Sequence, residues 1–222
     1  ADNDGEKDML ISGSVAGPID NLNLTSTLGS VKQTLTGADA TWEFDQKLVK
    51  TAYGLGLHRK LTKLELTDAA SAAGYVINST GATDKTLTAQ LTGSGNVMFQ
   101  GTNPITVYNG ANDYTGKTTI ENTVVAGSNN ALGQTSALDI KAGGQFDLNG
   151  KTQTVKNLTT QALNALYGNG QMTLGGTSAI HGANAMFTAA TTLASGSSTT
   201  LFDAEGLGKG GISFADAAAG LI

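Results

Sequence analysis

Cysteine is absent from this chain of 222 residues, and proline, arginine and aromatic residues are scarce. The lack of cysteine excludes disulfide bonds, zinc–thiolate sites and thiol nucleophiles. It also suits a chain that is exported unfolded through an oxidising compartment, where stray disulfides would obstruct passage. Glycine, with 30 residues, and threonine are abundant instead, a composition typical of β-structure with many turns.

Positive charge is scarce as well. Lys and Arg total 13 against 18 Asp and Glu, which gives a net charge of -5. Neutralising nucleic-acid phosphates requires clustered basic residues, so no nucleic-acid partner is expected. Hydrophobic residues make up 39% of the chain and charged residues only 14%, the opposite of the balance in disordered proteins. We therefore predict that the chain folds.

Long apolar runs are missing too, because no stretch approaches the roughly 20 residues that a membrane-spanning helix requires. Residues 1–8 form a polar run without the pattern of a signal peptide. We therefore expect that any targeting segment has been removed, and that the end at Ile222 is a cut rather than a natural terminus.

What the chain does contain, from about Lys85 onward, is a succession of short runs in which apolar and polar residues alternate. Such alternation predicts half-buried strands, and the Gly, Asn, Asp and Ser residues between the runs predict tight turns. Asn149-Gly150 is typical of a turn with positive φ. In the clearest stretch, 137–155, one face carries Leu138, Ile140, Phe146, Leu148 and Val155.

Two architectures produce this rhythm. One is an antiparallel sandwich or barrel, and the other is a parallel β-helix whose coils, or rungs, hold three short strands in about 20 to 25 residues. Segment 127–140 is echoed by segment 168–180, and such echoes favour a solenoid. We therefore predict an all-β chain folded as a right-handed parallel β-helix (β-solenoid) with three-strand rungs.

The whole chain, residues 1–222, is predicted to form a single β-helical segment. Its parts differ in regularity: residues 1–80 are less regular, residues 86–160 hold the best repeats, and residues 161–222 form further rungs or an end region. Residues 42–50 form a more charged stretch that is compatible with a partly helical structure, whereas the alternation in residues 63–67 favours a strand over a short helix.

Three motifs in the middle of the chain resemble a known repeat. They are Asn112-Asp113-Tyr114-Thr115-Gly116-Lys117-Thr118-Thr119-Ile120, Asn130-Ala131-Leu132-Gly133 and Phe146-Asp147-Leu148-Asn149-Gly150. By their order and spacing over residues 86–160, the chain resembles the autotransporter-associated β-strand repeat. That family has a Gly-Gly-Thr-Leu-like run after the Thr-Thr-Ile strand, where this chain has Glu121-Asn122-Thr123-Val124-Val125, a change of turn residues.

The resemblance implies a passenger domain of a type V secretion system, exported through the periplasm and outer membrane of a Gram-negative bacterium to the cell surface or the medium. It implies an outer-membrane β-barrel translocator, part of the same precursor, as a partner. A structural or adhesive role follows, in cell adhesion, self-association or biofilm formation, or in passenger folding during export. The expected ligand is a host or bacterial surface glycan or protein, or another copy of the chain. We expect no catalytic residue, cofactor or metal.

The alternative function is a carbohydrate-active enzyme domain on the same scaffold, which would need paired carboxylates. Glu43 with Asp45, or Asp139 with Asp147, would supply such a pair. The two later aspartates occupy outward positions of the alternation, as solvated residues do. The single Arg59 also leaves little positive charge to stabilise an enolate-like anion.

Other motifs match ligand-binding patterns only in part. Residues 111–118 satisfy a relaxed phosphate-loop pattern, but we expect a strand after them instead of the required helix, and interpret them as a turn. Residues 2–8 hold four acidic side chains without the spacing of a calcium loop, and we interpret them as solvated. His58 and His181 lack the spacing of metal ligands or of a serine-hydrolase site, so structural or surface roles are expected.

One basic stretch is singled out as a candidate site for a polyanion or glycan. Its residues are Lys47, Lys50, Arg59, Lys60 and Lys63. Four acidic residues flank them: Glu43, Asp45, Glu65 and Asp68. Opposite charges cancel much of each other's field within a Debye length of about 8 Å. A solvated face of mixed charge is therefore the competing interpretation.

Overall fold

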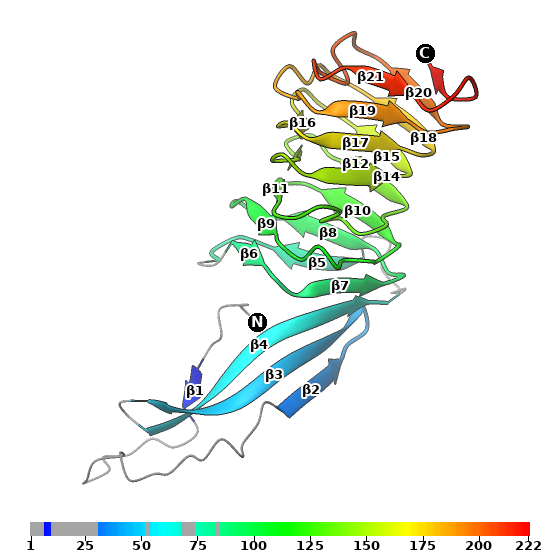
Figure 1. Cartoon of the computed structure of the whole chain (residues 1–222). Helices are drawn as coiled ribbons and strands as arrows, with labels where there is room; N and C mark the ends of the chain where they lie inside the picture. Colours follow the sequence, from blue (N-terminus) through cyan, green and yellow to red (C-terminus); the bar gives the residue numbers. More distant parts are fainter. Residues whose placement is uncertain (1–6, 10–30, 52–53, 68–73, 83–84) are drawn as a thin grey trace.

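The computed structural model describes residues 7–9, 31–51, 54–67, 74–82 and 85–222. Every regular element among them is a β-strand, which confirms the all-β prediction. Figure 1 shows the strands stacked into a column of rungs, with an antiparallel sheet at the N-terminal end. Within these described ranges, no helix has the length and apolar character needed to cross a membrane.

The column has three faces, and each is a parallel sheet. The first face contains eight strands: β5 (Tyr75–Asn78), β8 (Val97–Gln100), β10 (Lys117–Ile120), β12 (Ala137–Ile140), β15 (Asn157–Thr160), β18 (Thr177–Ile180), β20 (Ser198–Leu201) and β22 (Gly220–Leu221). The second contains β6 (Thr86–Leu87), β9 (Ile105–Val107), β11 (Thr123–Ala126), β13 (Gln145–Asp147) and β16 (Leu166–Tyr167). The third contains β14 (Thr152–Val155), β17 (Gln171–Leu174), β19 (Ala190–Leu193) and β21 (Ile212–Phe214). The predicted parallel β-helix is confirmed, with β12, β13 and β14 as one three-strand rung.

Neighbouring strands of a face pair residues that lie one rung apart in the sequence. Asp139 pairs with Thr159, which in turn pairs with Ala179. One rung therefore takes about 20 residues, in agreement with the predicted period. The echoed segments 127–140 and 168–180 accordingly lie two rungs apart on the same faces of the column.

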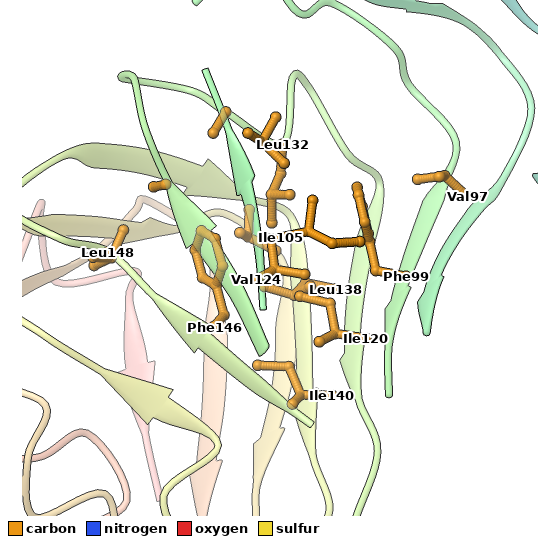
Figure 2. Close-up of a cluster of buried hydrophobic side chains, with 14 of the residues drawn as sticks. Val97, Phe99, Ile105, Ile120, Val124, Leu132, Leu138, Ile140, Phe146 and Leu148 are labelled. Atoms are coloured by element: carbon orange, nitrogen blue, oxygen red, sulfur yellow. The ribbon is translucent and has the colours of Figure 1, made fainter. Parts of the chain in front are cut away.

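The inward side chains of all three faces meet in one continuous apolar core. The five residues of 137–155 that were predicted to share a face are all fully buried, although they come from three different sheets. Figure 2 shows several of them, including Leu138, Ile140 and Phe146, among the side chains inside the column. The turn at Asn149 and Gly150 adopts φ angles of 45° and 76°, so the predicted positive-φ turn is also confirmed.

The antiparallel sheet at the N-terminal end corrects the prediction of one uninterrupted β-helix. It consists of β1 (Lys7–Met9), β2 (Val31–Thr36), β3 (Ala40–Thr51) and β4 (Gly54–Leu66). Alternation is the same in both kinds of sheet, but a two-residue connection such as that between β3 and β4 can join only antiparallel strands. Residues 42–50 lie in strand β3, so the partly helical interpretation of that stretch is wrong. Residues 63–66 lie in β4, which confirms the preference for a strand there.

The antiparallel sheet joins the column through β4. The end of β4 pairs in parallel with β7 (Gln90–Gly93), with Lys63 opposite Gln90 and Leu66 opposite Gly93. Across the same junction, the Trp42 indole Nε1 donates a hydrogen bond to the Tyr75 hydroxyl at 3.0 Å. The two rings meet edge to face, with centroids 5.8 Å apart. The junction is therefore fixed by backbone pairing and by packing together.

Candidate functional site

The basic stretch lies on the two long antiparallel strands, outside the column of rungs. Lys47 and Lys50 belong to β3, whereas Arg59, Lys60 and Lys63 belong to β4. The side chains of Lys47 and Lys50 lie outside the described part of the structure. The structure therefore places the five residues on one hairpin, without showing a common pocket for them.

Acidic residues are interleaved with this basic stretch. The strand register places Asp45 opposite Lys60, and Glu43 opposite Lys63. Lys63 also lies 3.9 Å from Glu65, and both side chains are substantially exposed. Exposed pairs of this kind contribute little stability but reduce the net field. This arrangement supports the competing interpretation, a face of mixed charge, and contact with a polyanion stays a prediction.

The segment that matches the phosphate-loop pattern is a turn followed by a strand. Lys117, its only cation, begins β10, and no helix N-terminus follows to face an anion. The Lys117 ammonium instead binds the carboxylate of Asp139 on the next rung, at 2.9 Å. The interpretation of residues 111–118 as a turn is confirmed.

Asp139 is held by two lysines on the outside of the first face. Lys141 binds the same carboxylate oxygen as Lys117, at 2.7 Å, and Gln161 donates to the other oxygen at 3.3 Å. Burial acts to raise the pKa of Asp139, but the hydrogen bonds and positive charge of Lys141 and Lys117 outweigh it, so the pKa lies below its ordinary value. Asp139 points outward as predicted, yet it is largely covered rather than solvated.

The two carboxylate pairs considered for catalysis occupy different surroundings in this structure. Asp139 lies on the first face and Asp147 on the second, so the two side chains stand on different sides of the column. Glu43 and Asp45 face Lys63 and Lys60 across the hairpin. Among the described residues, no group of three or more His, Asp or Glu side chains could hold a metal ion. The N-terminal acidic cluster falls largely outside these residues.

The two histidines lie at opposite ends of the molecule. His58 lies in β4 and pairs with Lys47 and Lys7 in the antiparallel sheet. His181 follows β18 and stacks on Phe202 of the next rung, with ring centroids 3.9 Å apart and an interplanar angle of 9°. The predicted surface and structural roles agree with these positions.

In chain order, β7 follows β6 of the second face just as β14 follows β13, so β7 takes the place of the third face on its rung. Between β7 and β14 this face is interrupted. On two successive rungs, residues 111–116 and 131–136 pass this face without forming a strand. A buried side-chain amide bridges the rungs here: the Asn112 Oδ1 accepts a hydrogen bond from the Leu91 N–H at 2.8 Å, and its Nδ2 donates to the Ala131 carbonyl at 2.7 Å. The amide adds to backbone hydrogen bonds between these rungs, such as that from the Asp113 N–H to the Leu91 carbonyl at 3.0 Å.

Gln153, two rungs further along, bonds the rung that lies between it and Asn112. Its Oε1 accepts a hydrogen bond from the Leu132 N–H at 3.0 Å, and its Nε2 donates to the Gly133 carbonyl at 3.3 Å. Both amides are almost fully buried. The paired amides and the remaining backbone hydrogen bonds together connect these rungs, although no continuous sheet forms here.

A groove of about 380 Å³ lies over the interruption. Its lining offers amides, hydroxyls and one ammonium group, and it includes no His, Asp or Glu. The lining residues are Gly110, Asn112, Asn130, Gly133, Gln134, Thr135, Thr154 and Lys156. Chemically, such a lining can form many hydrogen bonds and attract a negative charge, and it holds no carboxylate or imidazole for proton transfer.

Sequence reasoning missed this groove, because an interrupted face has no signature in the alternation of apolar and polar residues. The only local signal is the segment Asn130-Ala131-Leu132-Gly133, in which Asn130 and Gly133 adopt φ angles of 51° and 55°. That segment was noted for its resemblance to a repeat and not for a site.

With this fold, the chain is a parallel β-solenoid. No family model matches it, and no solved structure matches it. It is distantly similar to two proteins of Escherichia coli K-12. The uncharacterized lipoprotein YdeK is 32% identical over 147 residues, which cover 57% of this chain and 11% of YdeK. The uncharacterized protein YuaQ is 32% identical over 197 residues, 77% of this chain and 14% of YuaQ.

The chain therefore spans only a small part of the length of these relatives. The similarity relates it to segments of large proteins, and their printed names state no activity. The resemblance to the autotransporter-associated repeat accordingly stays a prediction.

Proposed function

We propose that the chain is a segment of a surface-exposed or secreted passenger of the autotransporter type, with a structural and adhesive role. The observation that carries the proposal is the parallel solenoid itself, because an elongated stack of rungs presents large outward faces. Its similarity to parts of two much larger proteins suits a segment within a long passenger. One of these relatives is a lipoprotein, which supports association with the bacterial envelope.

The outward surface of the third face supports adhesion by hydrogen bonding. The strand register aligns four hydroxyl-bearing residues on successive rungs: Thr154, Thr173, Thr192 and Ser213. The hydroxyls of Thr192 and Ser213 lie 3.1 Å apart. Such a row offers donors and acceptors at the regular strand spacing of about 4.8 Å, which a second copy or a polar polymer can match.

The test is aggregation of cells that display the longer protein, with and without these 222 residues. Display is quantified with an epitope tag, and clumping is scored by settling and by adherence to a surface. We expect deletion to reduce clumping while display is unchanged. If neither clumping nor display changes, the adhesive role is contradicted and the segment acts as a spacer. A fall in display would instead assign the segment to folding or export.

A second variant tests the contribution of the outward hydroxyl row to clumping separately from that of the whole segment. Replacing Thr173 and Thr192 by Glu places like charges on neighbouring rungs and should reduce clumping at low salt. The matched control replaces the same two residues by Ser, which keeps both hydroxyls. Equal clumping by both variants would show that this row takes no part in adhesion.

A further inference from the structure

The groove on the third face has a rigid floor. Thr135, which is almost fully buried, donates to the Gly116 carbonyl at 2.8 Å and accepts from the Thr118 hydroxyl at 2.9 Å. Thr118 is in turn bonded to the hydroxyl of buried Tyr114 at 2.6 Å. With Asn112 also bonded to both neighbouring rungs, the floor is set before a ligand arrives. Such preorganisation lowers the entropic cost of binding.

The walls of the groove, by contrast, carry polar side chains that are available to a ligand. Asn130, Gln134, Thr154 and Lys156 are all exposed. None of these side chains makes a hydrogen bond to another described residue. Together they provide two amides, a hydroxyl and an ammonium group, so donors and acceptors alternate around one concave surface. A ligand rich in hydroxyl groups would satisfy them.

Charge narrows the class of ligand. Lys156 is the only charged residue of the lining. The chain as a whole is acidic, with a net charge of -5, whereas the groove lining carries one positive charge and no negative charge. A carboxylate on the ligand would gain a charge-assisted hydrogen bond here, about twice as strong as a neutral one.

An exposed aromatic residue precedes the groove lining by two positions in the chain. Tyr108 is 53% exposed. Its ring packs over Gly127, where a Cβ atom would lie only 2.7 Å from it. The next residue, Ser128, lies against Gly110 of the groove lining. An aromatic face of this kind offers apolar contact to the C–H side of a sugar ring, while its hydroxyl stays in water.

We propose that this groove binds an acidic saccharide, a short sugar chain that carries carboxylates. The volume of about 380 Å³ falls within the range of small-molecule sites, about 300–1,000 Å³. Gln134, Asn130 and Thr154 bond the sugar hydroxyls, Lys156 binds a carboxylate, and Tyr108 packs against the end sugar. This site deepens the adhesive function proposed above, and it rests on that function only for the setting in which the ligand is met.

The test is titration of the 222-residue chain with trigalacturonate, followed by chemical shifts of the backbone amides. Maltotriose, a neutral trisaccharide, serves as the second probe. We expect shifts confined to the groove and the Tyr108 loop, and at least fivefold tighter binding of trigalacturonate than of maltotriose. Equal affinity for the two probes, or shifts elsewhere on the column, would overturn the proposal.

Variants separate the contribution of charge from that of stacking. Lys156→Gln should weaken binding of trigalacturonate at least fivefold and leave maltotriose unchanged. Tyr108→Ala should weaken both probes to a similar extent. The control is Lys209→Gln, which removes an exposed lysine outside the groove and should change neither affinity. If Lys156→Gln and Lys209→Gln behave alike, Lys156 does not recognise the ligand and the proposal fails.

The outcome of the saccharide titration is independent of the outcome of the cell-aggregation experiment. Saccharide binding without any effect of the segment on clumping would preserve the site and contradict the adhesive role. Clumping that depends on the segment, with no saccharide bound by the groove, would preserve that role and contradict the site.

Discussion

The Lys117 ammonium and the Asp139 carboxylate bind each other between neighbouring rungs at 2.9 Å, and Lys141 completes a triad at the same oxygen. The Asp139 side chain is only 11% exposed, whereas the lysines are 41% and 36% exposed. The carboxylate is therefore shielded, while both cations keep part of their hydration. The triad joins neighbouring rungs on the outside of the column.

Removing the negative charge of this triad should destabilise the chain. Asp139→Asn leaves two lysines facing each other without a counter-charge, and we expect a loss of about 1–2 kcal/mol at pH 7. Urea denaturation of both proteins measures it. Asp203→Asn, on an exposed turn without an ion pair in the described structure, is the control and should change stability by less than about 0.5 kcal/mol.

The stabilisation by Asp139 should also depend on pH. Its pKa in the folded chain is lowered, so its contribution is complete above the unfolded-state pKa of about 3.9 and is lost as the pH falls through the lower folded pKa. The difference between the native chain and Asp139→Asn should therefore shrink below about pH 4. A difference that stays constant from pH 7 to pH 3 would assign the effect to packing.

The buried amide of Asn112 should contribute more to stability than an exposed amide that also bridges two rungs. Asn112→Ala leaves the Leu91 N–H and the Ala131 carbonyl without their partner, and we expect a loss of about 2–4 kcal/mol. Asn129 accepts one hydrogen bond from Thr152 in an exposed position, where water can replace it. Asn129→Ala should cost less than about 1 kcal/mol, and similar losses for both variants would refute the bridging role.

Replacing a buried hydroxyl that lacks a partner should stabilise the chain. The Thr199 hydroxyl is fully buried and has no hydrogen-bond partner among the described residues. Thr199→Val keeps the shape and should raise the unfolding free energy by about 1 kcal/mol. Thr160 provides the comparison, since its buried hydroxyl bonds both the N–H and the carbonyl of His181. Thr160→Val should be destabilising, and the same sign for both valines would contradict the prediction.

Two glycines with similar backbone angles should respond differently to alanine. Gly93 and Gly143 have φ angles of 94° and 88°. A Cβ atom on Gly93 would lie 2.1 Å from the Leu66 carbonyl oxygen, whereas one on Gly143 would meet nothing within 4 Å. Gly143→Ala should cost only the conformational strain, about 1–2 kcal/mol, and Gly93→Ala should cost clearly more because β4 and β7 must separate. Thermal denaturation of both variants distinguishes the two costs.

The repeating part of the column was predictable because its strands and turns are determined by residues close together in the sequence. Leu138, Ile140 and Phe146 alternate with polar residues in short runs, and the turn at Asn149 and Gly150 marks where the chain changes face. Each rung repeats a similar pattern of apolar residues and turns over about 20 residues, so weak self-similarity was enough to favour a solenoid.

The antiparallel hairpin and the groove were not predictable in the same way. Residues 40–66 are less regular than the later rungs, and the direction of strand pairing depends on connections that the pattern does not encode. Asn112 and Gln153 are polar, so a pattern places them outside, yet both are buried because each pairs with backbone groups on adjacent rungs. Asp139 was expected to be solvated, but Lys117 of the neighbouring strand and Lys141, two residues further along the chain, cover it.

The contact between Trp42 and Tyr75 gives the molecule a built-in optical reporter. Trp42 is the only tryptophan of the chain, and it lies at the junction between the hairpin and the column. Its emission therefore follows detachment of the hairpin, whereas the circular dichroism of the strands follows melting of the rungs. A single melting temperature in both signals would make the molecule one cooperative unit, and an earlier change in fluorescence would make the hairpin a separately melting cap.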